Sequence, residues 1–293
     1  MMLTDDELMR YSRQVLLDGW DIDAQLRLKH SRIIMVGAGG LGCPAAETLA
    51  RAGVGNIHLI DDDVIEISNL QRQTLFLPQD LGEPKAQVAA ARLLEINELI
   101  TVSYEVARVE AANAAELLKL PAKVETVTQT IASAAASQLT PLPDLLLDCT
   151  DNFAIRELLN RISVVYGIPL LSASAIGMTG QLALYEPTLS SGCYHCVFGD
   201  SIASASNAAE NNSSENNAAD NDTSAEQNCA NSGVLASTTA IMGNLQANAA
   251  LQYLGLQNNP LAQQLLLWDG QRMRQRNIGY RQDPACPICG PAA

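Results

Sequence analysis

Basic residues are scarce in this chain, and their scarcity excludes whole classes of partner. Eighteen Lys and Arg residues stand against 32 Asp and Glu residues, which leaves a net charge of −14 and an isoelectric point near 4.5. A protein that binds a phosphate backbone or an anionic membrane surface needs a concentration of positive charge that this composition does not supply. We therefore expect no nucleic-acid partner and no membrane partner, and any local group of cations needs a local explanation.

Long apolar runs and a secretion signal are also missing. No stretch approaches the roughly 18 apolar residues of a membrane-spanning helix, and Met1 to Glu7 lack the basic and apolar regions of a signal peptide. Because the seven cysteines are odd in number, they favour thiols, a metal site or catalysis over a disulfide framework. The expectation is a cytoplasmic globular protein.

No G-x-x-x-x-G-K-[ST] loop occurs, but another glycine motif does. The apolar run Ile33 to Val36 is followed by GAGGLG, and Gly39, Gly40 and Gly42 of this turn are expected to face a phosphate together with a helix N-terminus. A second apolar strand ends at Asp61, whose carboxylate is placed to accept hydrogen bonds from ribose hydroxyls. The stretch predicts nucleotide binding. For a lone motif of this kind, the alternative is a Rossmann unit followed by ordinary surface charges.

Amide and cationic donors follow the second strand, on the ligand side of the expected sheet. They are Asn69, Arg72, Gln73 and Lys85. Such a cluster suits a triphosphate, because attack on an α-phosphate needs cations that neutralise its equatorial oxygens and the leaving pyrophosphate. A nicotinamide dehydrogenase needs no such cluster, and the three histidines offer it no good acid–base residue.

Two acids follow the short apolar strand Leu145 to Leu147, at the edge of the sheet where ligands bind in open α/β folds. Of the two, Asp148 and Asp151, we choose Asp151 as the Mg²⁺ ligand, because an unpaired carboxylate beside phosphates would repel them. The alternative role for Asp151 is that of a turn or cap residue before the helix at Phe153.

Two C-x-x-C pairs, Cys193/Cys196 and Cys286/Cys289, predict a tetrahedral structural zinc site. A redox pair or coincidence is the alternative. Between the pairs, residues 201–228 are almost wholly Ser, Ala, Asn, Asp and Glu, a composition that predicts a mobile loop. Residues 122–143 suggest an enlarged surface connection. Cys229 precedes a helical pattern and is a candidate sulfur-transfer thiol, because a helix N-terminus lowers a thiol's pKa.

Four motifs together resemble the ThiF/MoeB/HesA family of ubiquitin-activating-type adenylyltransferases. They are the GAGGLG turn, the run SNLQRQ from Ser68 to Gln73, the pair Pro84-Lys85 and the run DCTDN from Asp148 to Asn152. The resemblance extends from Arg10 to Gly290. It implies a homodimer of one α/β domain over residues 1–293, with a Rossmann-like mixed sheet that has a parallel nucleotide-binding half and antiparallel C-terminal strands.

The resemblance also implies an activity. ATP and the C-terminal glycine carboxylate of a small ubiquitin-like sulfur carrier ending in Gly-Gly would give an acyl-adenylate and pyrophosphate. The carrier expected first is the small subunit of molybdopterin synthase, for molybdenum cofactor biosynthesis, and the alternative is the thiamin-pathway carrier. Sulfur would come from a separate sulfurtransferase or pass through Cys229.

Roles follow residue by residue from the same resemblance. Arg72, Lys85 and Arg13 of the partner subunit would hold the phosphates, while Asn69 and Gln73 orient them. Asp61 would bind the ribose and Asp63 would also contact the nucleotide. Asp151 would hold Mg²⁺.

Overall fold

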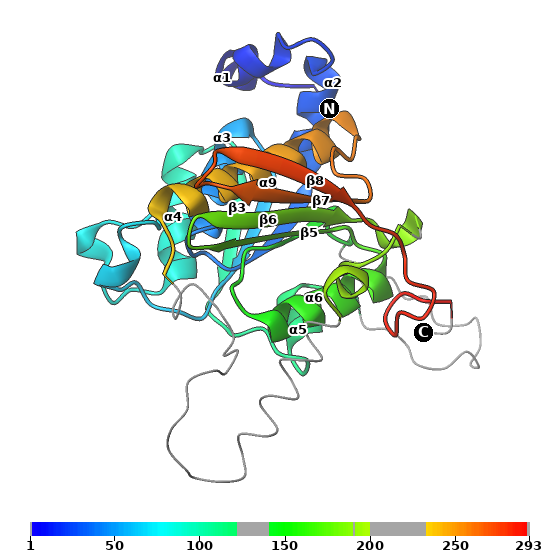
Figure 1. Cartoon of the computed structure of the whole chain (residues 1–293). Helices are drawn as coiled ribbons and strands as arrows, with labels where there is room; N and C mark the ends of the chain where they lie inside the picture. The colour runs from blue at the N-terminus through cyan, green and yellow to red at the C-terminus, as the bar shows by residue number, and fades with distance from the viewer. Residues whose placement is uncertain (1, 122–140, 190, 200–232, 292–293) are drawn as a thin grey trace, which may run out of the picture.

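The computed structural model describes residues 2–121, 141–189, 191–199 and 233–291 (Figure 1). Within them, one mixed sheet has the strand order β3-β2-β1-β4-β5-β6-β7-β8. The first five strands in this order pair in parallel, and β6, β7 and β8 add to them antiparallel. This arrangement confirms the predicted fold class. The strands are β1 (Arg32–Val36), β2 (Asn56–Ile60), β3 (Thr101–Glu105), β4 (Leu145–Asp148), β5 (Leu170–Ile176), β6 (Thr179–Tyr185), β7 (Gln264–Asp269) and β8 (Arg274–Gly279).

Helices cover both faces of the parallel half. On one face pack α2 (Asp21–His30), α3 (Gly42–Ala52), α4 (Lys85–Ile96) and α9 (Ala236–Leu256), and on the other α5 (Ala114–Leu117) and α6 (Phe153–Tyr166) (Figure 1). The strands serve both layers, because alternate residues point to opposite faces. Ile33 and Met35 of β1 enter the core beneath α3 and α9, whereas Ile34 and Val36 enter the core beneath α6.

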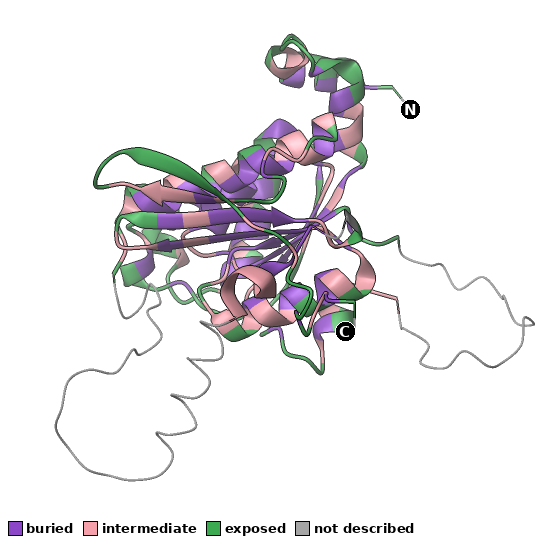
Figure 2. Cartoon of the chain, turned by 45° about the vertical axis from the view of Figure 1, so that its right-hand side comes forward, coloured by how far each residue is buried: buried purple, intermediate pink, exposed green. Residues whose placement is uncertain are grey.

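The edge formed by β7 and β8 is far less covered than the centre of the sheet. Every residue of β8 is exposed, while the central strands are buried along nearly their whole length (Figure 2). None of the described helices is long and apolar enough to span a membrane.

The first helix, α1 (Asp5–Val15), begins at a capping box formed by Thr4 and Glu7. The Glu7 N–H donates to Thr4 Oγ1 over 3.2 Å and the Thr4 N–H donates to Glu7 Oε2 over 2.7 Å, which completes a capping box. The apolar residues of this helix are only partly buried. Tyr11 lies in the core, but Leu8 and Leu16 are exposed, since α1 stands out from the body and packs mainly on α2 (Figure 1).

Three sequence expectations lie outside the described residues. They are the loop at 201–228, most of the connection at 122–143, and Cys229.

Candidate active site

The glycine turn between β1 and α3 is built so closely that side chains are excluded. Gly37 has a φ of +97°, and a Cβ placed on it would lie 2.8 Å from the carbonyl oxygen of Cys149. A Cβ on Gly42 would lie 2.1 Å from the carbonyl oxygen of Gly37. The first turn of α3 has no side-chain cap. Within this turn the Cys43 N–H donates to the Gly39 carbonyl over 2.9 Å and Pro44 has no N–H, so the donor that α3 offers to an anion is the Gly42 N–H.

A cavity of about 560 Å³ opens at the carboxyl ends of β1, β2, β4 and β5. It brings together nine of the predicted site residues: Gly39, Gly40, Asp61, Asp63, Asn69, Arg72, Gln73, Lys85 and Asp151. Gly42 does not line the cavity; it is a buried residue at the start of α3. Arg13 is not part of the lining; it is an exposed residue of α1.

Lys85 is the first residue of α4 and only 5% of its surface is exposed. Its ammonium group lies 2.6 Å from Asp63 Oδ2, and its backbone N–H donates to the Asp63 carbonyl over 3.0 Å. Asp63 therefore holds Lys85 from both ends. Because an ammonium has three donors, this ion pair leaves capacity for a phosphate.

Asp61 ties the end of β2 to the glycine turn. Its Oδ2 accepts the Ala38 N–H over 2.7 Å and its Oδ1 accepts the Asp63 N–H over 2.9 Å. Burial raises the pKa of this carboxyl, while these N–H donors and Lys85 oppose the increase. Asp61 thus fixes the position of the glycine turn relative to the end of β2, and this turn is the part of the site that would bind a phosphate.

The segment from 66 to 73 presents its donors from a short 3-10 helix (Ile67–Asn69). Asn69 is buried and its Oδ1 accepts the Glu66 N–H over 3.0 Å, while Arg72 donates to the Ser68 carbonyl over 2.9 Å. The Oε1 atom of Gln73 is buried and has no hydrogen-bond partner among the described residues. Since buried polar atoms are normally paired, this amide marks a place where a ligand completes the site.

The two acids after β4 have different roles. Asp148 is fully buried, whereas Asp151 is exposed and lines the cavity. The cap of α6 is Asn152, whose Oδ1 accepts the Ile155 N–H over 3.1 Å, so Asp151 does not serve as the cap residue. Its carboxylate at the edge of the sheet is an oxygen donor of the kind that Mg²⁺ prefers.

Several lining residues were not predicted. Arg108 follows β3, Arg156 lies in the first turns of α6, and Thr239 of α9 would contact a Cβ on Gly40 at 3.0 Å. Tyr194 and Phe198 close the side near the cysteine pairs. None of them belongs to a local motif of the kind used above; only the packing of separate elements brings them here.

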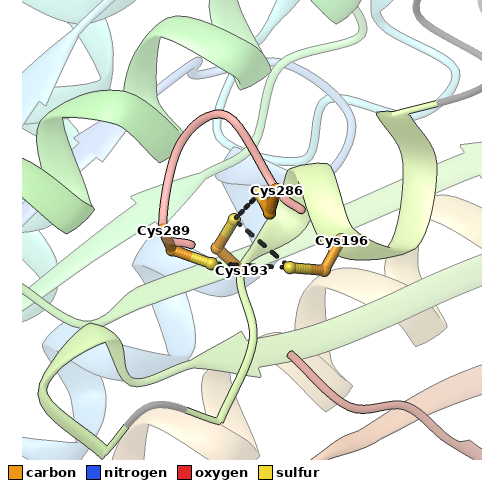
Figure 3. Close-up of side chains that lie close together, drawn as sticks. All are labelled: Cys193, Cys196, Cys286 and Cys289. Carbon is orange, nitrogen blue, oxygen red and sulfur yellow. Dashed lines mark hydrogen bonds between the residues drawn. The ribbon is translucent and has the colours of Figure 1, made fainter. Parts of the chain in front are cut away.

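The four cysteines of the two C-x-x-C pairs converge (Figure 3). The sulfur of Cys193 lies 3.9 Å from that of Cys196 and 3.8 Å from that of Cys286, and Cys196 lies 3.4 Å from Cys289. A tetrahedral zinc thiolate with Zn–S bonds of about 2.3 Å requires sulfurs about 3.8 Å apart. The donor set and its spacing therefore fit zinc.

The other two described cysteines, Cys43 and Cys149, are small buried residues of the core. Burial raises the pKa of Cys43 to about 12, and burial also raises that of Cys149. Neither thiol is a nucleophile near neutral pH.

Comparisons with known proteins agree with this geometry. The sulfur carrier protein ThiS adenylyltransferase of Escherichia coli (strain K12) is 35% identical over 288 residues, covering 98% of this chain and 97% of that protein. The molybdopterin-synthase adenylyltransferase of the same strain is 33% identical over 291 residues, covering 98% of each. A solved structure of E. coli MccB with MccA-N7isoASN matches with a TM-score of 0.72 at 22% identity over 97% of this chain and 74% of that one, which supports the fold. Residues 11–288 match the ThiF family, and the chain belongs to it.

Proposed function

We propose that this protein is an adenylyltransferase that activates the C-terminal glycine carboxylate of a small ubiquitin-like sulfur carrier. The observation that carries the proposal is the gathering of Asn69, Arg72, Gln73, Lys85 and Asp151 around one cavity above the glycine turn. This donor set suits attack on an α-phosphate, and the names of the two E. coli relatives describe this class of activity. The proposed enzyme is one adenylyltransferase domain over residues 1–293, working in the cytoplasm.

In this mechanism a carrier carboxylate oxygen forms a bond to the α-phosphorus of ATP, and the bond to the bridging oxygen breaks to release pyrophosphate. Arg72 and Lys85 stabilise the charge that develops on the phosphate oxygens, with Asn69 and Gln73 orienting them. Asp61 keeps the glycine turn in place beside the ribose. Asp63 holds Lys85 at its working position, a role that the ion pair of 2.6 Å supports.

Asp151 is the residue that would hold Mg²⁺, which supplies neutralising charge to the phosphates when it is bound. Arg13 of the partner subunit would add a further cation in a homodimer. The four clustered cysteines would hold a structural zinc ion.

The carrier proposed first is the small subunit of molybdopterin synthase. The thiamin-pathway carrier is a second candidate, because the ThiS adenylyltransferase is 35% identical and the molybdopterin-synthase adenylyltransferase 33%. A sulfurtransferase would supply sulfur to the adenylate in either case. Cys229 is the candidate thiol if an acyl-enzyme step intervenes.

The test is ATP–pyrophosphate exchange with each purified carrier in the presence of Mg²⁺. We expect exchange with one carrier and none when its terminal glycine is removed. Exchange with neither carrier would refute the proposed function.

A further inference from the structure

Arg156 is a buried cation in the wall of the cavity that the proposed reaction does not use. It projects from the first turns of α6, with 8% of its surface exposed. One of its terminal nitrogens, Nη2, donates to two carbonyls: that of Thr150, in the loop after β4, and that of Ala173 on β5, the latter over 3.0 Å. A single guanidinium therefore connects α6, the loop and the neighbouring strand.

Asp148, the last residue of β4, contacts both the same loop and Arg156. Its Oδ2 lies 3.5 Å from Arg156 Nε and accepts the Ser172 hydroxyl over 2.6 Å. Its Oδ1 accepts both the N–H and the hydroxyl of Thr150, over 3.0 and 2.7 Å. The two buried charges thus form an ion pair, in which Asp148 is also held by hydrogen bonds while Arg156 Nε makes no hydrogen bond to any described residue.

Thr150 is consequently held at every polar atom: Asp148 takes its N–H and hydroxyl, and Arg156 takes its carbonyl. On the far side, Asn152 is held as the cap of α6. The residue between these two anchors is Asp151, which is itself exposed on the cavity. The backbone on both sides of Asp151 is thus fixed by hydrogen bonds, and Asp151 itself lines the cavity.

We propose that Arg156 is a positioning residue that, with Asp148, presents the Asp151 carboxylate to the Mg²⁺ of the nucleotide. The inference deepens the proposed function and rests on its assignment of Asp151. Partners that orient a metal ligand typically contribute 10- to 100-fold to metal affinity. The effect of Arg156 should accordingly be visible in the metal dependence of ATP binding and be transmitted through Asp151.

The experiment measures the Kd of ATP with and without Mg²⁺ by calorimetry, using the full chain without any carrier. The readout is the ratio of the two Kd values. We expect Asp151→Asn to remove the gain in affinity that Mg²⁺ provides and Arg156→Lys to reduce it about tenfold. In the double variant, Arg156→Lys should cause no further loss. Arg161→Lys is the matched control, since Arg161 lies on the same helix, pairs with Glu157 and does not line the cavity.

Hydrogen exchange gives a second readout that needs no metal. Residues 149–152 should exchange faster in Arg156→Lys than in the wild type. Should that variant fail to fold, Thr150→Val removes only the hydroxyl contact with Asp148 and should lower the Kd ratio in the same direction by a smaller factor.

Two results would overturn the inference. One is loss of ATP affinity in Arg156→Lys by the same factor with and without Mg²⁺. The other is an additive effect of Arg156→Lys and Asp151→Asn, since independent action means that Arg156 does not work through Asp151. Both results are separate from pyrophosphate exchange, so the proposed function stands or falls on its own test.

Discussion

At the scale of single residues, Lys85 shows how the site keeps a buried charge usable. Only 5% of the surface of Lys85 is exposed, and its ammonium group has an anionic partner in the Asp63 carboxylate at 2.6 Å. Asp63 is itself largely exposed, so the pair is open to solvent and to a ligand on one side. The cation that the proposed mechanism places at the phosphates is thereby held in position by the protein itself.

Replacing Lys85 should consequently cost catalysis more than folding. We expect Lys85→Ala to lower the rate of pyrophosphate exchange by roughly 10²- to 10³-fold, because one positioned donor at a developing charge contributes about that much. Arg72→Ala should act in the same way. The control is Arg92→Ala on the same helix, whose side chain pairs with Asp80 and Glu95 outside the cavity and whose loss should leave the rate unchanged.

His58 should make the stability of the protein depend on pH. It is buried on β2, its Nδ1 lies 2.8 Å from Ser103 Oγ, and burial together with Lys119 lowers its pKa below the ordinary 6.5. Because the unfolded chain binds the proton at higher pH than the folded chain, the stability this residue gives at neutral pH is lost as pH falls through 6.5 toward the lower folded pKa. Chemical denaturation at pH 7.5 and pH 5 should show the decrease, and His58→Gln should flatten it. An equal decrease in the variant would assign the effect to other groups.

At the scale of elements, a helix, strand or turn could be predicted from the sequence where residues close together in the chain determine it. The glycine turn and β2, which Asp61 follows, lie where the sequence predicts, because each is determined by residues that are close together in the chain. The individual strands β7 and β8 could not be located in this way. The segment Gln264–Asp269 is an apolar run of a length that suits a buried strand or helix equally, and β8 has hardly any apolar pattern.

The residues of the candidate site also differ in whether nearby sequence predicts them. Asn69, Arg72, Gln73 and Lys85 follow one strand and were predictable as a cluster. Arg156 was not, since its role depends on Ala173 of β5 lying beside the loop after β4, and strand neighbours far apart in sequence carry no local signal.

The cysteine site is the element that joins the end of the described chain to its middle. We expect Cys286→Ser to reduce zinc content below one ion per chain and to lower the thermal midpoint by on the order of 5 °C or more, because structural zinc stabilises the fold that binds it. Metal analysis and thermal unfolding would measure both effects. The control is Cys149→Ala. This variant should bind as much zinc as the wild type, since Cys149 is a core residue after β4 and does not belong to the cluster of four cysteines. Full stability of Cys286→Ser would contradict a structural role.

At the scale of the whole molecule, we expect the long segment at residues 201–228 to take no part in the activation of the carrier carboxylate. Residues 201–228 contain no Lys or Arg, so they bring no cation to the phosphates. Replacing this segment with a short Gly/Ser linker should leave pyrophosphate exchange close to the wild-type rate. A large loss of exchange would instead make the segment a gate or a docking surface.

Cys229 offers a way to tell the two carriers' pathways apart. It has no role at a phosphate in the proposed mechanism, so Cys229→Ala should retain exchange. Mass spectrometry of the carrier after incubation with ATP, a sulfurtransferase and cysteine should show thiocarboxylate in the molybdopterin case, where a persulfide attacks the adenylate directly. Thiocarboxylate should be absent in the thiamin case. Loss of exchange itself in Cys229→Ala would contradict this division of roles.

The distance along the chain between the two cysteine pairs has a consequence for synthesis. Cys193 and Cys286 are 93 residues apart, and α9, β7 and β8 are all made between them. At roughly 5–20 residues per second, a ribosome needs on the order of ten seconds to produce that stretch. During this interval Cys193 and Cys196 are two thiols without the other half of the proposed zinc site, and they are exposed to oxidation or to a metal ion that two ligands can bind. A cell under oxidative stress should therefore damage newly made copies of this protein more readily than finished ones.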